Sequence, residues 1–313
     1  MDEPEAWIRA HAEVTGPIET THEQLWSTVR RVPTADGVWW WKAPDGAAEA
    51  PLTAFLASLT PDAVTPVVAI DPVHGWLLLR DAGTRLREIL ERDPDLSHWE
   101  RALGTVAELQ LAAAPHVDEM LAMGVPDRRL ERLPDLIEAL LGQDEFLMLD
   151  EDEGLTHDQR DTLVAQVPAI RAMCQELAAA GVAPSVQHDD LNDGNVYVDG
   201  DASRIVDWGD ACISHPFHVL TVALRATTWK LGLTPGGPEV RRLRDAYLEP
   251  FAGDRAELAR LADLAYRTGT LARAYAWMTY VAPRPPEERG DDLESVPYGL
   301  RKFLEDGPVG DWS

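Results

Sequence analysis

Apolar and polar positions alternate in short runs over the first eighty residues of the chain. Residues 25–32 and 38–41 are rich in β-branched and aromatic side chains, and the Ala-Asp-Gly sequence at 35–37 is typical of a turn. Residues 67–71 and 75–83 give two more apolar runs of strand length. The pattern therefore predicts a β-rich meander in the amino-terminal part of the chain.

The remainder of the chain shows helical spacing. The sequence at 156–159 is typical of a capping box, and the helix that it opens should end near Gly181. Pro168 predicts a kink in this helix, or its division in two. Residues 216–233 and 254–281 also read as helices. The 156–181 segment should face the protein core with one apolar stripe, which consists of Leu163, Val167, Ile170, Cys174 and Leu177.

The densest cluster of reactive side chains lies in residues 186–211. His188 and Asp190 come first, Asn195 follows five residues after Asp190, and Asp207 follows two short apolar runs. If these runs pair as a hairpin around residues 199–200, with Val198 opposite Arg204, then Asn195 lies opposite Asp207. Directly opposed residues have Cβ atoms about 5 Å apart. We therefore expect an amide and a carboxylate at one end of a hairpin.

These residue types suit phosphoryl transfer. Mg²⁺ prefers oxygen ligands and usually shares them with substrate phosphates. The reaction also needs a carboxylate that receives the proton of the acceptor hydroxyl. The alternative is that His188, Asp190 and Asn195 only cap a turn, since Asp and Asn are common there. The agreement between spacing and hairpin geometry favours the functional interpretation.

The segment resembles the catalytic loop and metal-binding triplet of the protein-kinase-like superfamily, H-x-D-x-x-x-x-N followed by D-x-G. Within that superfamily it is similar to the aminoglycoside phosphotransferase family, in which the loop commonly reads HGDLHPGN and the triplet lies in IDWGDA. The corresponding strings here are HDDLNDGN and VDWGDA. The resemblance implies catalytic roles for Asp190 and His188, and magnesium ligation by Asn195 and Asp207.

The resemblance also implies an α+β, bilobal protein-kinase-like fold. Residues 1–82 would form a small nucleotide-binding lobe with an antiparallel β-sheet, ending in a hinge. Residues 83–313 would form a larger, mainly helical lobe with the catalytic loop and the substrate site. Backbone groups between Leu79 and Asp81 would meet the adenine edge. The glycine-rich phosphate loop has no counterpart, because residues 16–24 between the first two expected strands lack G-x-G-x-x-G.

Lys42 ends the Val-Trp-Trp-Trp run and is one of only three lysines in the chain. It matches the family lysine that contacts the nucleotide phosphates, although an edge lysine that discourages strand pairing would look the same. Glu49 is the best candidate to hold it, because Pro51 suits the first turn of a following helix. A solvated glutamate favoured by the helix dipole is the alternative for Glu49.

Residues 215–218, His-Pro-Phe-His, follow the triplet. The family often has an Asp-Leu pair here, which braces the catalytic loop, and His218-Val219 stands in its place. We expect His218 to be a histidine satisfied within the core.

Composition narrows the possible partners. The chain has 54 acidic and 28 basic residues and a net charge of −26, so we expect no nucleic acid partner. The acidity would attract a cationic acceptor, although an ordinary solvated surface explains most of it. No apolar run approaches a membrane span. The two cysteines and the polar N-terminus favour a reducing cytoplasm over secretion.

Two functional hypotheses follow from the sequence. The first is a phosphotransferase that moves the γ-phosphate of ATP, or of another nucleoside triphosphate, with Mg²⁺ to a hydroxyl of a small polar molecule. Aminoglycosides, amino sugars, other antibiotics and metabolite alcohols all qualify as acceptors. The second is a degenerate pseudokinase that binds nucleotide as a sensor or scaffold.

Overall fold

The computed structural model describes residues 2–305, and the chain packs into two compact units. The first unit consists of the residues up to Pro126 together with Asn192–Ala211. The second consists of Asp127–Leu191 together with the residues from Cys212 onward. The chain thus crosses between units directly after Leu191, inside the predicted catalytic loop. The predicted lobe boundary at residues 82–83 stays a prediction.

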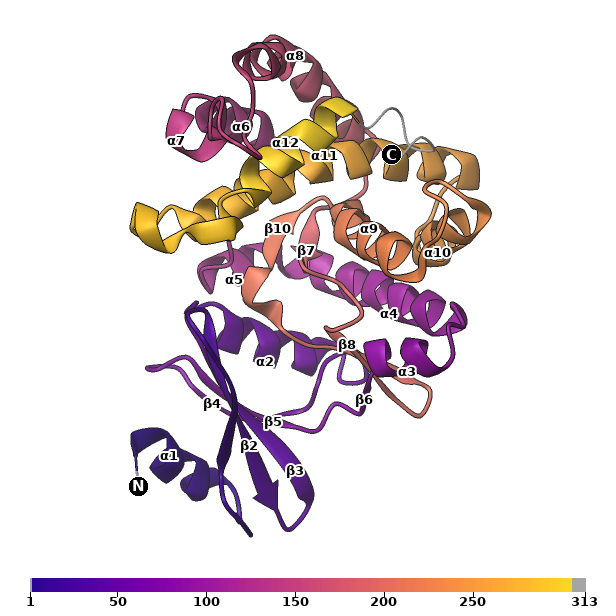
Figure 1. Cartoon of the computed structure of the whole chain (residues 1–313). Coiled ribbons are helices and arrows are strands. Elements are labelled where there is room, and N and C mark those ends of the chain that lie inside the picture. The colour runs from indigo at the N-terminus through magenta and orange to yellow at the C-terminus, as the bar shows by residue number, and fades with distance from the viewer. Residues whose placement is uncertain (1, 306–313) are drawn as a thin grey trace. The chain divides into compact units, whose positions relative to one another are not determined.

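The first unit contains a five-stranded antiparallel sheet in the order β1-β2-β3-β5-β4. Figure 1 labels its strands β2, β3, β4 and β5. The predicted meander and its turn at residues 35–37 are confirmed. The strands are β1 (Glu19–Gln24), β2 (Ser27–Thr34), β3 (Gly37–Pro44), β4 (Val67–Asp71) and β5 (Trp76–Arg80).

The prediction for residues 16–24 was wrong in one respect, because most of them form strand β1 and not a loop. Every residue of β1 is exposed, so this edge strand carries no apolar pattern that could reveal it. The connection between β1 and β2 is the short turn at Leu25-Trp26, whose side chains are 68% and 45% exposed. This turn has no glycine.

The pleat of β3 separates two sets of side chains. Trp39 and Trp41 are buried in a core with Ile8 of α1 (Glu3–His11). Trp40 and Lys42 occupy the opposite face, since side chains alternate along a strand. The register places Trp40 beside Leu79 and Lys42 beside Leu77 on β5.

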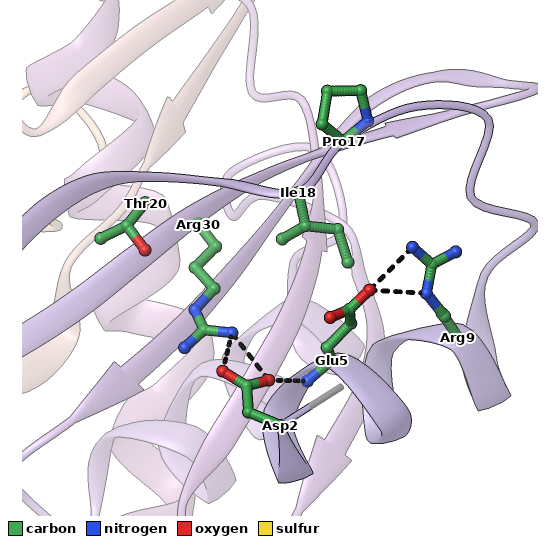
Figure 2. A pocket seen from close by; sticks show the side chains of 7 residues that line it. All are labelled: Asp2, Glu5, Arg9, Pro17, Ile18, Thr20 and Arg30. Atoms are coloured by element: carbon green, nitrogen blue, oxygen red, sulfur yellow. Dashed lines mark hydrogen bonds and ion pairs between the residues drawn. The ribbon is translucent and has the colours of Figure 1, made fainter.

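Helix α1 is held against the sheet by charged contacts. Asp2 caps the helix by accepting a hydrogen bond from the backbone N–H of Glu5 at 2.8 Å, and its carboxylate lies 2.8 Å from Arg30 of β2. Figure 2 shows these contacts within a pocket of about 430 Å³, where Glu5 also pairs with Arg9. The charged side chains in this pocket are thus paired with one another or cap the helix, which gives them a structural role.

The rest of the first unit places the predicted hairpin beside further helices. Gly83 has φ +108°, and a Cβ there would collide with the carbonyl of Val198, so the close approach of the two segments requires glycine. A three-stranded sheet has the order β6-β8-β9. Its strands are β6 (Thr84–Arg85), β8 (Val196–Asp199) and β9 (Ala202–Ile205), and the helices are α2 (Glu49–Leu59), α3 (Leu86–Arg92), α4 (Ser97–Ala113) and α5 (Val117–Ala122).

The second unit is mainly helical, and the long helix α11 packs against most of its other helices (Figure 1). The two helices predicted at 216–233 and 254–281 are confirmed. A short antiparallel pair, β7 (Ser185–Gln187) and β10 (Cys212–Ser214), is also present. The helices are α6 (Leu133–Leu141), α7 (Asp144–Leu147), α8 (His157–Ala179), α9 (Val219–Leu231), α10 (Pro238–Leu248), α11 (Arg255–Val281) and α12 (Ser295–Glu305).

Helix α8 confirms the predicted capping box between Thr156 and Gln159, and its predicted apolar stripe is buried. Of the two outcomes predicted at Pro168, a division of the helix is wrong, because α8 runs through it, and a kink stays a prediction. Pro168 lies on the exposed side of the helix, and so does Val164, whose carbonyl loses its N–H donor. Water can satisfy that carbonyl, which makes an internal proline tolerable here.

Candidate active site

Lys42 of β3 is held between two carboxylates of the first unit. Its ammonium Nζ lies 2.6 Å from Glu49 Oε1 and 2.6 Å from Asp207 Oδ1. Glu49 is the first residue of α2, and Asp207 follows strand β9. The structure therefore brings together the Lys42 and Glu49 that the sequence proposed as partners. The contact with Asp207 was not predicted.

Burial and charge act in opposite directions on this cluster. The Lys42 and Glu49 side chains are only 12% and 4% exposed, whereas that of Asp207 is 51% exposed. Burial alone would lower the pKa of Lys42, but the charges of Glu49 and Asp207 outweigh it and raise that pKa above its usual value. Burial raises the pKa of Glu49, and the Lys42 charge opposes the rise. Lys42 therefore stays an ammonium ion at neutral pH.

Gly209 lies so close to Glu49 that a larger residue would not fit there. A Cβ at this position would lie 2.9 Å from Glu49 Oε2, closer than real side chains approach. Because Glu49 is buried and bound to Lys42, it has little freedom to move away. The third residue of Asp207-Trp208-Gly209 thus leaves room for the glutamate.

The hairpin that carries Asn195 and Asp207 forms, but its predicted register is wrong by one residue. Val196 pairs with Ile205 and Tyr197 with Arg204, so Asn195 comes opposite Val206 and not Asp207. The loop is the two-residue Gly200-Asp201, with Gly200 at φ +60°, and it fixes this register.

Asn195 and Asp207 nevertheless lie at the same end of this hairpin. The backbone N–H of Val206 donates to the carbonyl of Asn195 at 3.0 Å. Asp207 itself adopts φ +67°, the left-handed region, directly after that bond. The backbone therefore changes direction at Asp207, immediately after this hydrogen bond to the β8 side of the hairpin.

The loop before Asn195 is fixed by an arginine that the sequence did not single out. Arg87 of α3 donates to Asp193 Oδ1 at 2.7 and 2.9 Å, and its backbone N–H donates to the carbonyl of Asp193. A Cβ on Gly194 would lie 2.9 Å from the Arg87 guanidinium. The chain leading into β8 is therefore rigidly attached to α3.

These oxygen donors suit a hard divalent cation. Residues 2–305 contain no group of three or more His, Cys, Asp or Glu side chains that could hold a metal ion. The protein would thus supply few ligands, such as the Asp207 carboxylate and the Asn195 amide. This donor set fits Mg²⁺, which keeps several waters and shares phosphate oxygens with a nucleotide.

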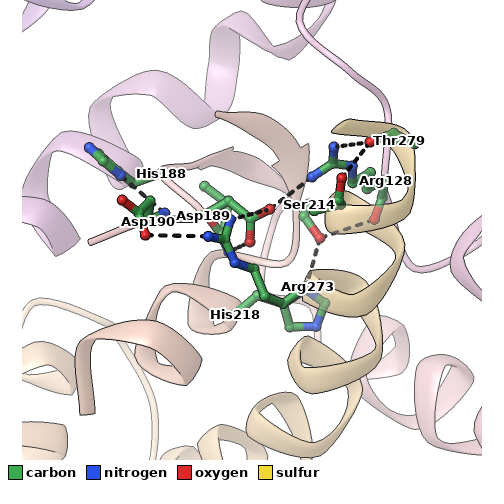
Figure 3. A network of polar contacts seen from close by, with 10 residues as sticks. Arg128, His188, Asp189, Asp190, Ser214, His218, Arg273 and Thr279 are labelled. Atoms are coloured by element: carbon green, nitrogen blue, oxygen red, sulfur yellow. Dashed lines mark hydrogen bonds and ion pairs between the residues drawn. The ribbon is translucent and has the colours of Figure 1, made fainter. Parts of the chain in front are cut away.

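Asp190 and His188 belong to the second unit, directly after β7. The backbone N–H of Asp190 donates to His188 Nδ1 at 3.3 Å, and His188 is buried. The side chain of Asp190 is 36% exposed, and Arg273 of α11 reaches its Oδ1 at 3.3 Å (Figure 3). His188 therefore shapes the loop from inside while Asp190 remains accessible.

Asp189 is an unpredicted member of this loop. It adopts φ +62° at the position where the related loop carries glycine. Its buried carboxylate lies 2.8 Å from Arg128 and 3.6 Å from Arg273, and it accepts a hydrogen bond from Gln187 at 3.1 Å (Figure 3). The exchange of glycine for aspartate was visible in the sequence, but its arginine partners were not.

His218 confirms the prediction of a histidine satisfied within the core. Its ring nitrogens lie 2.8 Å from Ser214 Oγ and 2.9 Å from Thr268 Oγ1. Ser214 in turn donates to the carbonyl of Arg128. Burial lowers the pKa of His218 to about 3, so the ring is neutral in the folded protein.

Leu79 and Asp81 lie where the hinge was expected, at and just after the end of β5. Leu79 shares the sheet face of Trp40 and Lys42. The Asp81 carboxylate accepts hydrogen bonds from the Trp40 indole at 3.1 Å and from the Gly83 N–H at 2.9 Å. The Asp81 side chain thus has a structural role, and any contact with a base would fall to the backbone.

Neither cysteine forms a disulfide, and both are buried. Burial raises the pKa of Cys174 and of Cys212 to about 12, so neither is a thiolate at neutral pH. Among residues 2–305 no helix combines the length and apolarity required of a membrane span.

Comparison with known proteins identifies the family. The model of the phosphotransferase enzyme family (APH) matches residues 18–264, which is most of the chain. No curated protein matches the sequence closely enough to count as a relative.

Solved structures share the fold at low sequence identity. An aminoglycoside 2′-phosphotransferase-IIIa in complex with GDP has a TM-score of 0.63 at 16% identity, with 97% of this chain and 98% of that chain covered. The macrolide 2′-phosphotransferase apoenzyme from Brachybacterium faecium has a TM-score of 0.59 at 15% identity, with 95% of this chain and 97% of that chain covered. An amicoumacin kinase in complex with AMP-PNP, Ca²⁺ and Ami has a TM-score of 0.61 at 11% identity, with 100% of this chain and 96% of that chain covered.

These likenesses confirm the predicted α+β, kinase-like fold, and the family model confirms the resemblance on which that prediction rested. The chain therefore belongs to the phosphotransferase enzyme family and is a small-molecule phosphotransferase of kinase-like fold.

Proposed function

We propose that the chain transfers the γ-phosphate of ATP, or of another nucleoside triphosphate, to a hydroxyl group of a small molecule. The observation that carries the proposal is the position of Lys42, 2.6 Å from both Glu49 and Asp207. A buried ammonium ion held between two carboxylates costs desolvation energy and is a poor source of stability. A role in binding phosphates explains why the chain keeps it.

The nucleotide would bind on the sheet face shared by Lys42, Trp40 and Leu79. Lys42 would contact the α- and β-phosphates, and Glu49 would hold the ammonium in place. The backbone between Leu79 and Asp81 would meet the base. Nucleotides in two of the similar solved structures, GDP and AMP-PNP, support a triphosphate donor.

Asn195 and Asp207 would hold Mg²⁺ at the end of the hairpin. When bound, the cation would neutralise charge on the phosphates as the γ-phosphoryl group is transferred. Lys42 would supply a second positive charge beside Asp207. The oxygen-only donor set supports magnesium in preference to zinc or copper.

Asp190 would accept the proton of the acceptor hydroxyl. The acceptor oxygen would then bond to the γ-phosphorus while the bond from that phosphorus to the β,γ-bridging oxygen breaks, leaving a nucleoside diphosphate. Arg273 would orient the Asp190 carboxylate, and His188 would hold the loop that carries it. Proton acceptors of this kind typically contribute 10²–10⁴-fold to the rate.

The alternative of a pseudokinase gains no support, because Lys42, Asp190, Asn195 and Asp207 are all present and the chain belongs to a family of enzymes. We also propose that the enzyme acts in the cytoplasm, where nucleoside triphosphates are found. Two buried free thiols support a reducing compartment.

The test compares two lysine variants for Mg-ATP binding by thermal shift and calorimetry. Lys42→Ala should lose measurable binding, whereas Lys230→Ala, at the end of α9, should bind as the wild type does. Transfer of labelled γ-phosphate to a panel of hydroxyl compounds then tests turnover. Equal Mg-ATP affinity in Lys42→Ala and the wild type would rule out the proposed nucleotide site.

A further inference from the structure

The second unit contains a cavity of about 780 Å³ lined by residues of α9, α11 and α12. Sites for small molecules commonly occupy about 300–1,000 Å³. One of its lining residues is Arg273, whose guanidinium lies 3.3 Å from the Asp190 carboxylate. The cavity therefore shares Arg273 with Asp190, the proposed acceptor of the hydroxyl proton.

Several aromatic side chains line the cavity. Trp229, Trp277, Tyr266 and Tyr298 all line it. The Trp229 side chain is 83% exposed, an unusual position for the largest apolar side chain. Aromatic rings placed in this way offer large flat faces to a ligand at little cost in conformational entropy.

The charged residues that line the cavity are all cations. They are Arg225, Arg273 and Lys302, and no Asp or Glu lines it among residues 2–305. This is notable in a chain with 54 acidic and 28 basic residues. The carboxylates that pair with two of these cations, Asp189 and Asp190 with Arg273 and Glu305 with Lys302, are not themselves lining residues.

The cations also lie over aromatic rings. The Arg225 guanidinium is 5.5 Å from the Tyr266 ring centroid, and that of Arg273 is 5.0 Å from the Trp277 centroid. Since these ring faces already carry a cation, a cationic ligand would meet like charge where it would otherwise find a π-face. A polycationic acceptor would also need carboxylates that the described lining does not provide.

We propose that the acceptor is a molecule with a flat or bulky apolar body and no net positive charge, neutral or anionic, which stacks on Trp229. This rests on the proposed phosphotransferase function and names its acceptor class. It departs from the cationic acceptor that the overall acidity of the chain suggested. Global charge describes the solvated surface, whereas the cavity lining determines the ligand.

The test uses an aromatic anion, 1-anilinonaphthalene-8-sulfonate, whose fluorescence rises on binding to the full-length protein. Saturable binding should weaken about tenfold in Trp229→Ala, which corresponds to ~1.4 kcal/mol. Val164→Ala is the matched control, since this apolar side chain on α8 is 48% exposed and lies outside the cavity. Arg225→Gln should also weaken binding of the anion.

Competition then tests the charge preference. Phenyl β-glucoside, a neutral aromatic compound with hydroxyl groups, should displace the probe, whereas the polycation neomycin should not at the same concentration. Equal probe affinity in Trp229→Ala and the wild type would overturn the proposal, and so would displacement by neomycin but not by the glucoside. Neither measurement needs nucleotide or turnover, so the outcome is independent of the Lys42 test.

Discussion

Arg273 of α11 connects two consecutive acids of the predicted catalytic loop, with its guanidinium 3.3 Å from Asp190 and 3.6 Å from Asp189. One cation thus serves a buried carboxylate and a partly exposed one. The buried partner fixes the arginine, and the arginine in turn restricts the exposed carboxylate. Asp190 is therefore held in one orientation, as the proposed transfer of a proton from an acceptor hydroxyl would require.

Replacing Asp190 by asparagine should lower turnover by about 10²–10⁴-fold and leave Mg-ATP affinity almost unchanged. The amide keeps the shape of the side chain but cannot accept the hydroxyl proton. Single-turnover transfer to an acceptor, together with calorimetry for the nucleotide, measures the two effects. Transfer at the wild-type rate would show that Asp190 is not the catalytic carboxylate.

Asp207→Ala should abolish magnesium-dependent nucleotide binding more severely than Asn195→Ala. The carboxylate opposes the cation with a full charge, whereas the amide offers only a dipole. Titration of Mg-ATP into each variant by calorimetry gives the comparison, and Asp201→Ala in the hairpin loop serves as control. If Asp207→Ala binds Mg-ATP as well as this control does, the assignment of the metal site fails.

Gly209→Ala should weaken Mg-ATP binding by about tenfold, although Gly209 contributes no side chain. The added Cβ would lie 2.9 Å from Glu49 Oε2 and would displace the carboxylate that holds Lys42. Gly46→Ala is the matched control, because a Cβ there meets no atom within 4 Å. The same affinity in both variants would mean that Glu49 moves aside without consequence.

Asp189→Gly should destabilise the protein by about 2 kcal/mol. Glycine would relieve the left-handed backbone strain, worth ~1 kcal/mol or more, but breaking a buried ion pair costs about 3–5 kcal/mol. Urea unfolding measures the difference. Adding Arg128→Met should recover part of the loss, because it removes the buried charge that Asp189 neutralises. If Asp189→Gly alone is more stable than the wild type, this balance of strain and ion-pair energy is contradicted.

Acid should destabilise the protein partly through His218. Burial lowers its pKa from 6.5 to about 3, so between these values the unfolded chain binds a proton that the folded protein does not. The contribution of His218 to the free energy of unfolding is therefore complete above about pH 6.5. It is lost as the pH falls, by up to about 1.4 kcal/mol per pH unit.

His218→Gln should reduce this pH dependence. Unfolding free energies at pH 7.5, 6.5 and 5.5 should fall less steeply for His218→Gln than for the wild type. The control His22→Gln lies on the exposed strand β1 and should keep the wild-type slope. Burial also lowers the pKa of His215. This residue would therefore leave part of the pH dependence of stability in both variants. Identical slopes in His218→Gln and the wild type would refute the assignment.

Local patterns in the sequence predicted much of this fold. The apolar runs of β2 to β5 and the capping box of α8 each depend on neighbours within a few residues, so a short window contains the necessary information. Strand β1 escaped because all of its residues are exposed and polar. The hairpin register was wrong by one residue because Asp199 pairs with Ala202 across the two-residue loop Gly200-Asp201, whereas the predicted pairing of Val198 with Arg204 required a connection over residues 199–203.

The candidate site was predictable only where a motif was complete. His188, Asp190, Asn195 and Asp207 stand at fixed spacings, and Lys42 follows a recognisable strand. The arginines that contact this loop stand at no fixed spacing from it in the sequence. Arg128 and Arg273 reach Asp189 from 61 and 84 residues away in the sequence, and no periodicity connects such positions. Only the packing of the second unit reveals them.

The Asp189–Arg128 pair also constrains how this loop could have changed over time. An aspartate arriving alone at a glycine position would carry backbone strain and a buried charge, and an arginine arriving alone would carry a buried charge of the opposite sign. Each intermediate is worse than either end state, so the order of replacement matters. Once both are present, neither reverts easily by itself, and the pair should persist among close descendants of this chain as a linked unit.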